Sequence, residues 1–479
     1  MNLLKISTAC AALALFCASS FAKNTPVQGL EEYKLENGLT LFTLEDHSVP
    51  LAHVEIAFRT GSTDQTLQNE GLFYLYEQLM FNGNELYPTS QDVTDALAEM
   101  GVTSYNSKTS SDSVYFHITV PSNQVEQALT FWNAAARTPN LQENSFLTAK
   151  RKLSITLQHY ASQQYAQLIS YKSIAMFPSA PWRTSDYIDS LQIENVKNAT
   201  ANDILDLQAK YFIPKNAAVI VGGDISPQNV LKLTQKIFGT WSNKSASQEA
   251  EEFTEYAPLK QQEQSLNPLK ETSFAVHAGP DTGKNLALVS VLFRGPDTDF
   301  DLEGTYTADF LTSALRAKTN ILKTELAKNK ELNLSPSENI LTSYITKRAD
   351  GLIEFSIFLA DPEDSIAERI KALPESLKLA LNNIALQDSM YTKESVQNIV
   401  GSLTDMGILA EENVSGRIST LRFWWACADS GYYYSYNSNL SLVTKQSVAR
   451  FLEKYINNSN PLVSVTIPQG TYESQKQLF

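Results

Sequence analysis

Apolar and polar residues alternate in two segments of the chain that resemble each other. Residues 51–64 read LAHVEIAFRTGSTD and residues 286–299 read LALVSVLFRGPDTD, and seven of the 14 aligned positions are identical. An alternation that ends in turn residues predicts a half-buried strand. A second pair, ILDLQAKY at 204–211 and VARFLEKY at 448–455, follows in the same order, and each member leads into a strand-like run. Two pairs in the same order indicate a duplicated domain.

Helical periodicity accompanies these strands in the N-terminal half. The clearest helical patterns cover residues 90–100, 124–136 and 145–176. The strands cluster instead of alternating strictly with helices, which predicts an α+β fold. With 479 residues, of which 43% are hydrophobic, the chain can fill more than one core. A polar stretch separates the halves. We therefore expect an N-terminal domain at 23–241, a linker at 242–271 and a C-terminal domain at 272–479.

The first 22 residues have the pattern of a secretory signal peptide. Lys5 supplies the positive charge, an apolar run follows, and Ser20-Phe21-Ala22 fits a small-x-small cleavage site. A membrane anchor and, because of Cys17, a lipoprotein leader are the alternatives. No other stretch reaches the roughly 18 apolar residues that span a bilayer. We therefore expect a periplasmic or secreted protein that is free of the membrane once residues 1–22 are removed.

The net charge argues against one class of partner, and the cysteine content excludes one means of stabilisation. The formal net charge is -14, and such a surface repels nucleic acid and anionic lipid, so we expect no nucleic-acid partner. Cys427 is the one cysteine that remains after removal of the signal peptide, which excludes an internal disulfide. The mature protein must therefore be held together by packing.

The segment at 70–83, EGLFYLYEQLMFNG, has the frame of a metal-binding helix. It resembles the G-L-x-H-x-x-E-H-x-x-F-x-G helix of the M16 peptidases (insulinase, pitrilysin and the mitochondrial processing peptidase). In that family the two histidines, four residues apart on one helical face, bind zinc, and the glutamate activates a zinc-bound water. Here Glu77 occupies the glutamate position, but Tyr74 and Gln78 occupy the two histidine positions.

The third zinc ligand of the family is a glutamate on a later helix. The spacing places it at Ser154 to Thr156, and residues 144–185 contain no Asp or Glu. A phenol and a neutral amide are poor zinc ligands, and the five histidines of the chain are not paired at helical spacing. We therefore expect the zinc cofactor to be lost and no metal to be bound. Without a metal-bound water, Glu77 is expected to be a helix residue satisfied by its neighbours.

Other features of the family follow in the expected order between about residues 30 and 475. Asn106, Ser107 and Thr109 match the stretch that enters the edge strand beside the family's active site, and the resemblance implies that they bind substrate. In the second half the family supplies an arginine and a tyrosine, seven residues apart, to hold the substrate. The best match, at 326–335, has Ala327 and Leu334 at these two positions. Both catalytic contributions are therefore expected to be missing.

The resemblance implies two homologous M16-type (LuxS/MPP-like) α+β domains that form half of a clamshell. The expected function is that of a catalytically inactive, non-catalytic subunit of a heterodimeric periplasmic zinc peptidase, with an active M16 chain as its partner. One alternative is a homodimer that binds peptides or unfolded protein without cleaving them. A second alternative is a peptidase with a non-standard metal site.

Overall fold

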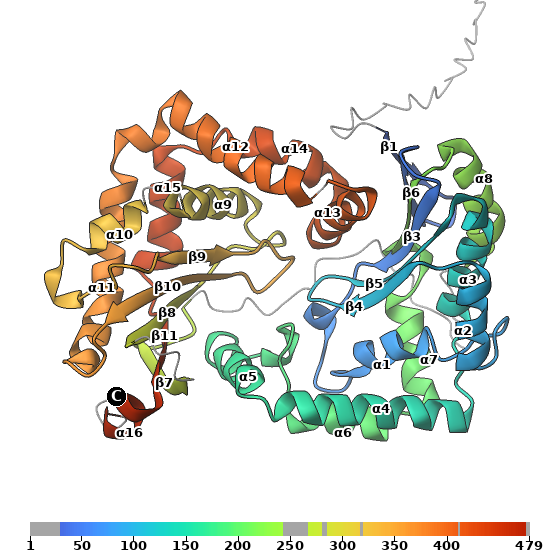
Figure 1. Cartoon of the computed structure of the whole chain (residues 1–479), viewed down its shortest axis with the longest axis horizontal. Coiled ribbons are helices and arrows are strands. Elements are labelled where there is room, and N and C mark those ends of the chain that lie inside the picture. Colours follow the sequence, from blue (N-terminus) through green and yellow to red (C-terminus); the bar gives the residue numbers. More distant parts are fainter. Residues whose placement is uncertain (1–28, 243–266, 280–284, 317–319, 411, 476–479) are drawn as a thin grey trace, which may run out of the picture.

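The computed structural model describes residues 29–242, 267–279, 285–316, 320–410 and 412–475 (Figure 1). The expected signal peptide at 1–22 and residues 243–266 of the expected linker lie outside the described residues. Among the described residues, no helix combines the length and the apolar character needed to cross a membrane.

The N-terminal half contains a six-stranded sheet with the order β1-β2-β6-β3-β5-β4. Neighbouring strands are antiparallel, except β2 and β6, which run parallel. The alternating segment at 51–64 begins with β3, so the predicted strand is confirmed, but the prediction that it is half-buried is wrong, because α13 (Val414–Cys427) covers its second face. The strands are β1 (Leu30–Lys34), β2 (Thr40–Glu45), β3 (Leu51–Phe58), β4 (Ser104–Thr109), β5 (Val114–Pro121) and β6 (Ala217–Gly223).

The C-terminal half contains a five-stranded sheet with the order β7-β11-β8-β10-β9. β7 and β11 run parallel, whereas the other neighbours are antiparallel. This order repeats the pairing of β2-β6-β3-β5-β4, so the duplication that the sequence indicates extends to strand order and direction. The strands are β7 (Ser273–Gly279), β8 (Leu286–Arg294), β9 (Leu341–Tyr344), β10 (Leu352–Ala360) and β11 (Leu462–Pro468).

Helices cover one face of each sheet and enclose a separate core in each half. The N-terminal helices are α1 (Leu72–Leu79), α2 (Ser90–Glu99), α3 (Val125–Arg137), α4 (Glu143–Ala161), α5 (Gln164–Met176), α6 (Ser190–Asn198), α7 (Ala201–Tyr211) and α8 (Pro227–Phe238). The C-terminal helices are α9 (Leu302–Arg316), α10 (Ile321–Leu326), α11 (Ile366–Ala385), α12 (Lys393–Ala410), α13 (Val414–Cys427), α14 (Ser430–Leu440), α15 (Lys445–Leu452) and α16 (Gln469–Gln475).

The prediction of one continuous helix over 145–176 is wrong, because the structure divides this segment into α4 and α5. Ser162 follows the last turn of α4, and its hydroxyl donates to the carbonyl of His159. Gln163 then adopts an extended conformation, with φ −85° and ψ 137°. Hydroxyl bonds to the preceding turn also occur inside α4, at Ser154 and Thr156, so the break lies in the backbone conformation of Gln163, which the apolar periodicity does not reveal.

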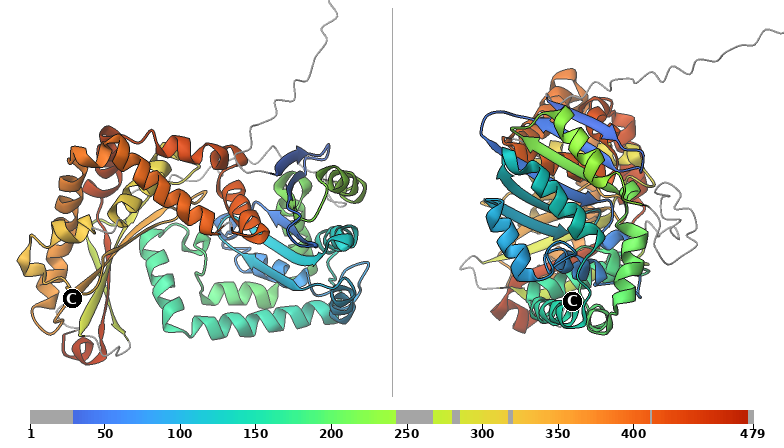
Figure 2. Two further views of the ribbon diagram at one scale, coloured as in Figure 1. Left: turned by 45° about the horizontal axis from the view of Figure 1, so that its top comes forward. Right: turned by 90° about the vertical axis from the view of Figure 1, so that its right-hand side faces the viewer.

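The second face of each sheet is covered by a helix from the other half (Figures 1 and 2). α13 packs on the N-terminal sheet, where Ile418 and Leu421 join Phe42 and Ile220 in one buried cluster. Conversely, the end of α5 packs on the C-terminal sheet, with Met176 and Phe177 against Leu292 and Leu462. The two halves therefore bury apolar area against each other in both directions and form one packed unit.

Gly222 on β6 allows α13 to approach this closely. A Cβ atom at this position would lie 2.7 Å from Cγ1 of Val414 and 2.8 Å from Cδ1 of Ile418. Both distances are shorter than a carbon–carbon contact permits, so α13 can pack this closely only because residue 222 is a glycine and has no side chain.

Candidate functional site on helix α1

Glu77 is held by two hydroxyl groups from the neighbouring edge strand. The Ser107 hydroxyl donates to Oε1 of Glu77 at 2.8 Å, and the Thr109 hydroxyl donates to Oε2 at 2.7 Å. Both donors belong to β4, which lies at the edge of the sheet and packs beside α1. Each carboxylate oxygen therefore has a partner within the protein, in agreement with a glutamate satisfied by its neighbours.

Tyr74 occupies the position of the first family histidine as a half-buried phenol. Burial raises the pKa of the Tyr74 hydroxyl well above its usual range, and the carboxylates of Asp186 and Glu77 raise it further. The hydroxyl is therefore protonated at neutral pH, whereas a metal would need the phenolate. Gln78, at the second position, is partly buried and offers a neutral amide.

The third ligand position lies on α4, which packs against α1. Of the three residues that the spacing allows, Ser154 is buried, whereas Ile155 and Thr156 are exposed. The hydroxyls of Ser154 and Thr156 donate to carbonyls of their own helix, those of Lys150 and Lys152. No residue at these three family positions offers an imidazole or a carboxylate, so this site does not fit zinc.

The three residues expected to bind substrate divide between the two faces of β4. Ser107 and Thr109 point to α1, while the pairing of Asn106 with His117 of β5 places Asn106 on the opposite face. The Oδ1 atom of Asn106 accepts from the backbone N–H of Ser107. The structure therefore brings two of the three residues to Glu77. The side chain of Tyr105, also on β4, is 62% exposed beside them.

The two degenerate positions of the second half lie between α10 and β9. Ala327 is the C-cap that follows α10, and Leu334 is partly buried against the C-terminal core. Leu334 also forms an isolated antiparallel bridge with Leu359 of β10. An alanine methyl group and a packed leucine offer no polar atom, so these side chains cannot hold a substrate backbone or an oxyanion.

Glu70 lies just before α1, and its surroundings shift the pKa of its carboxyl group. Sequence reasoning did not single it out. Its side chain is fully buried, and among the described residues neither carboxyl oxygen has a hydrogen-bond partner. Burial, together with the nearby Asp189 carboxylate, raises the pKa of Glu70 to about 8. The adjoining Gly71 has φ +87° and sits against Gln192 and Val196, which leaves no room for a side chain. The sequence contains no signal for this environment beyond the position of Glu70 in the helix frame.

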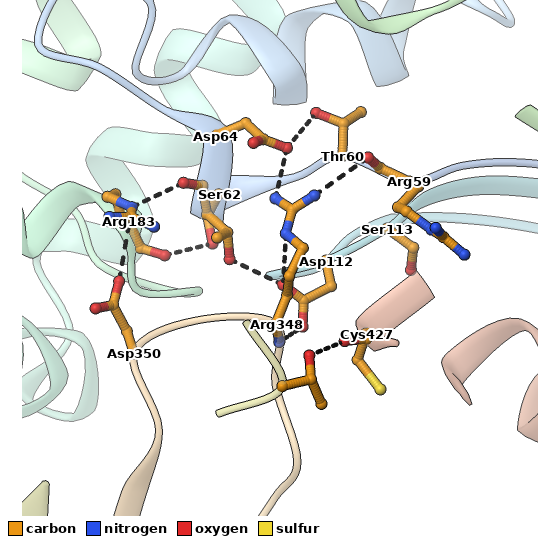
Figure 3. Close-up of polar contacts among 12 residues, drawn as sticks. Arg59, Thr60, Ser62, Asp64, Asp112, Ser113, Arg183, Arg348, Asp350 and Cys427 are labelled. Carbon is orange, nitrogen blue, oxygen red and sulfur yellow. Dashed lines mark hydrogen bonds and ion pairs between the residues drawn. The ribbon is translucent and has the colours of Figure 1, made fainter. Parts of the chain in front are cut away.

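A second polar cluster, also not anticipated, joins the two halves near α1 (Figure 3). The guanidinium of Arg348, from the turn between β9 and β10, reaches the carboxylate of Asp64 at 2.7 Å. The backbone N–H of Arg348 donates to Oδ2 of Asp112 at 3.0 Å. Arg183 pairs with Asp350 at 3.6 Å, and Thr298 donates to the carbonyl of Cys427. The contacts of Arg348 fix this turn on the segments that precede α1 and β5, the Arg183–Asp350 pair ties it to the segment after α5, and the Thr298 contact lies within the C-terminal half.

The fold and the α1 site together define a peptidase scaffold whose zinc-binding positions hold other residues. The chain belongs to peptidase family M16. Residues 41–180 match the model for insulinase (peptidase family M16), and residues 198–389 match the model for the peptidase M16 inactive domain. Together the two matches include more than half of the chain.

Curated relatives share about a quarter of their aligned residues or fewer with this chain. Zinc protease PqqE of Helicobacter pylori is 22% identical over 217 residues, which are 44% of this chain and 47% of that protein. Probable zinc protease PqqL of Haemophilus influenzae is 24% identical, over 43% of this chain and 23% of the relative. Non-peptidase homolog YmxG of Helicobacter pylori is 23% identical, over 39% and 42% respectively. The chain thus aligns with less than half of each relative's length.

Solved structures match over nearly the whole chain. A protease from Helicobacter pylori superposes with a TM-score of 0.68 at 18% identity, covering 92% of this chain and 99% of that one. The periplasmic protease PqqL from Escherichia coli superposes with a TM-score of 0.67 at 12% identity, covering 94% of this chain and 48% of that one. At these identities the likeness establishes the M16 fold.

Proposed function

We propose that this chain is a catalytically inactive M16 protein that serves as the non-catalytic subunit of a heterodimeric periplasmic zinc peptidase. The observation that carries the proposal is the state of Glu77. Both of its carboxylate oxygens accept hydrogen bonds from β4, and Tyr74 and Gln78 occupy the positions where zinc would be bound. A general base acts on a water whose pKa a metal has lowered, and the ligands for such a metal are missing.

The association with a second M16 chain rests on the architecture of the unit and on the family resemblance. The two domains are fixed to each other by apolar packing and by buried ion pairs, so they provide one rigid half of a chamber. Two of the relatives described above, one named as a zinc protease and one as a non-peptidase homolog, come from a single organism, Helicobacter pylori. The proposed pairing of an active with an inactive chain agrees with the presence of both kinds of protein in one organism.

A periplasmic location is part of the same proposal. The pattern of residues 1–22 predicts export, and the similar PqqL of Escherichia coli is described as a periplasmic protease.

The edge of the N-terminal sheet supports a role in holding peptide. β4 pairs with β5 on one side, so its other edge can receive an extended chain by strand addition.

The test is a reconstitution with an M16 chain of the same genome that has an intact H-x-x-E-H helix. Hydrolysis of an unstructured, fluorogenic peptide is measured for each mature chain alone and for the co-expressed pair. We expect no hydrolysis by this chain alone, and activity of the pair that is lost when the glutamate of the partner's motif becomes glutamine. Glu77→Gln in this chain should leave the activity of the pair unchanged.

Other outcomes would overturn the proposal. Chelator-sensitive hydrolysis by this chain alone, abolished by Glu77→Gln, would show a peptidase with a non-standard metal site. A stable homodimer that binds the peptide without cleaving it, and that does not associate with the active chain, would show the second candidate function. The free edge of β4 favours that candidate, because strand addition needs no catalytic residue.

A further inference from the structure

Three potential metal ligands meet on the face of the N-terminal sheet that is opposite α1. His53 and Glu55 lie two residues apart on β3 and therefore point to the same face. His117 on β5 is the strand partner of Glu55 in the antiparallel register. The neighbouring residues Val54 and Ile56 point the other way, into the N-terminal core. The ligand cluster thus faces α13, the helix that the C-terminal half lays over this sheet.

The distances within this cluster approach those of a metal site. Nε2 of His53 lies 3.3 Å from Oε2 of Glu55, and Nδ1 of His117 lies 3.9 Å from the same oxygen. One ligand atom from each of the three residues can be chosen so that all lie within 4.8 Å of one another. Bonds of about 2.0–2.1 Å in a tetrahedron place neighbouring ligand atoms roughly 3.3 Å apart. A rotation of the Glu55 carboxylate that brings its second oxygen to the imidazoles, together with rotations of the imidazoles, therefore separates this arrangement from a coordinated one.

Several polar atoms of the cluster are buried without a protein partner. The side chains of His53 and Glu55 are 4% and 0% exposed. Among the described residues, Nδ1 of His53, Oε1 of Glu55 and Nδ1 of His117 have no hydrogen-bond partner. An unsatisfied buried polar group destabilises the fold, so a cation that engages one or more of these atoms after rotation of the side chains would remove that penalty.

Arg422 of α13 would compete with a metal ion for the carboxylate of Glu55. Its Nη1 atom lies 2.8 Å from Oε2 of Glu55, and its guanidinium stacks on the ring of Tyr115 at 3.4 Å. This ion pair engages Oε2 and leaves Oε1 without a partner. A metal-bound carboxylate commonly accepts a hydrogen bond on its second oxygen, so Arg422 and a metal can share Glu55. The positive charge of Arg422 will nevertheless weaken the affinity for a cation.

The duplicated domain provides an internal comparison. In the second sheet, Ser290 and Ser356 occupy the paired positions that correspond to Glu55 and His117, and their hydroxyls lie 3.2 Å apart. This pair satisfies itself with one hydrogen bond and contains no good metal ligand. The first sheet therefore carries ligand-type side chains at a position where the fold itself requires only a small polar pair.

We propose that His53, Glu55 and His117 bind a divalent transition-metal ion of the zinc class between the N-terminal sheet and α13. Two imidazoles and one carboxylate are a donor set that zinc accepts. Because α13 covers the cluster, the ion would stabilise the contact between the two halves. This site is distinct from the α1 position, and it stands or falls independently of the proposed function.

The experiment is a zinc titration of the metal-stripped, full-length mature protein by calorimetry, with zinc content measured by elemental mass spectrometry. We expect close to one bound zinc per chain. The double variant His53→Gln/His117→Gln should lose at least about 100-fold in affinity, because only one of the three ligands remains. His277→Gln, which changes a partly buried histidine on β7, is the matched control and should bind like the wild type.

Two further measurements guard against a folding artefact. Zinc at about 100 times its Kd should raise the thermal midpoint of the wild type but not that of the double variant. Arg422→Gln removes the competing charge and should tighten zinc binding about tenfold or more. Absence of zinc binding by the wild type, full retention of zinc by the double variant, or an affinity unchanged by Arg422→Gln would each overturn the proposal.

Discussion

Arg348 and Asp64 form an ion pair of 2.7 Å in which the two side chains are only 2% and 3% exposed. The two residues are 284 positions apart and belong to different halves of the chain. The carbonyl of Arg59 accepts a second contact from the same guanidinium at 3.4 Å. A pair this deeply buried is costly to break from one side, because the remaining charge is left without compensation. The two halves are therefore expected to unfold together.

Arg348→Met should destabilise the protein by about 3–5 kcal/mol, since it leaves the Asp64 carboxylate buried and unpaired. Urea-induced unfolding followed by tryptophan fluorescence measures the change. Arg450→Met is the matched control, because Arg450 pairs with Glu303 on the surface at 3.0 Å with both side chains largely exposed. The control should change stability by less than about 1 kcal/mol. Equal effects of the two substitutions would contradict the role given to the buried pair.

Glu70 makes stability depend on pH in a defined direction. The fold raises the pKa of this carboxyl to about 8 from its ordinary value of 4.5, so the folded state keeps a proton that the unfolded chain releases. The resulting stability is fully present below about pH 4.5 and is lost as the pH rises through 8. Glu70→Gln, a neutral substitute, should therefore be more stable than the wild type by roughly 1–3 kcal/mol at pH 9.

Urea unfolding of both proteins at pH 5 and pH 9 tests this prediction. The two should differ little at pH 5, where the wild-type carboxyl is already protonated. Glu126→Gln on α3, whose side chain is 49% exposed, is the control and should show no such dependence on pH. A Glu70→Gln protein that is less stable than the wild type at pH 9 would mean that the buried carboxylate has a partner that stabilises it.

The geometry of α1 and α4 should still support zinc once the ligands are restored. Tyr74→His, Gln78→His and Ser154→Glu together place two imidazoles four residues apart and a carboxylate on the helix packed beside them. In a background with His53→Gln and His117→Gln, this triple variant should bind about one zinc per chain, and the background alone should bind none. Elemental mass spectrometry measures the difference. No gain of zinc would show that the helices no longer hold the family's ligand geometry.

Gly222→Ala should weaken the packing of α13 on the N-terminal sheet and thereby lower the stability of the protein. The added methyl group would lie within 2.8 Å of the side chains of Val414 and Ile418. Overpacking of this kind costs about 1–3 kcal/mol. Gly401→Ala in α12 is the control, because a Cβ there meets no atom within 4 Å, and alanine favours a helix over glycine. The prediction fails if both variants show the same midpoint in thermal unfolding.

The sequence predicted those features that depend on local pattern. The alternation at 51–64 and 286–299 identified β3 and β8, and the duplication agrees with the matching strand orders of the two sheets. The break between α4 and α5 escaped prediction, because apolar periodicity continues across residues 162 and 163 while the extended backbone of Gln163 ends the helix. The substitutions at Tyr74 and Gln78 were visible because the frame around them is fixed by helical spacing.

Features that depend on contacts between distant residues could not be predicted. His53 and His117 have no sequence spacing that indicates a metal site, and only the antiparallel register of β3 and β5 brings them together. Arg348 lies in a turn whose sequence gives no sign of a buried partner. The separation of Asn106 from Ser107 and Thr109 follows from strand alternation, which the family resemblance alone does not resolve.

The central claim, that the α1 site has lost its zinc, is tested most directly by zinc-edge anomalous diffraction from crystals of the mature protein supplied with zinc. The account predicts no anomalous peak beside Tyr74, Glu77 and Gln78, whether or not a peak is present between β3 and β5. A peak at bonding distance, about 2.0–2.2 Å, from any of these three side chains would contradict it.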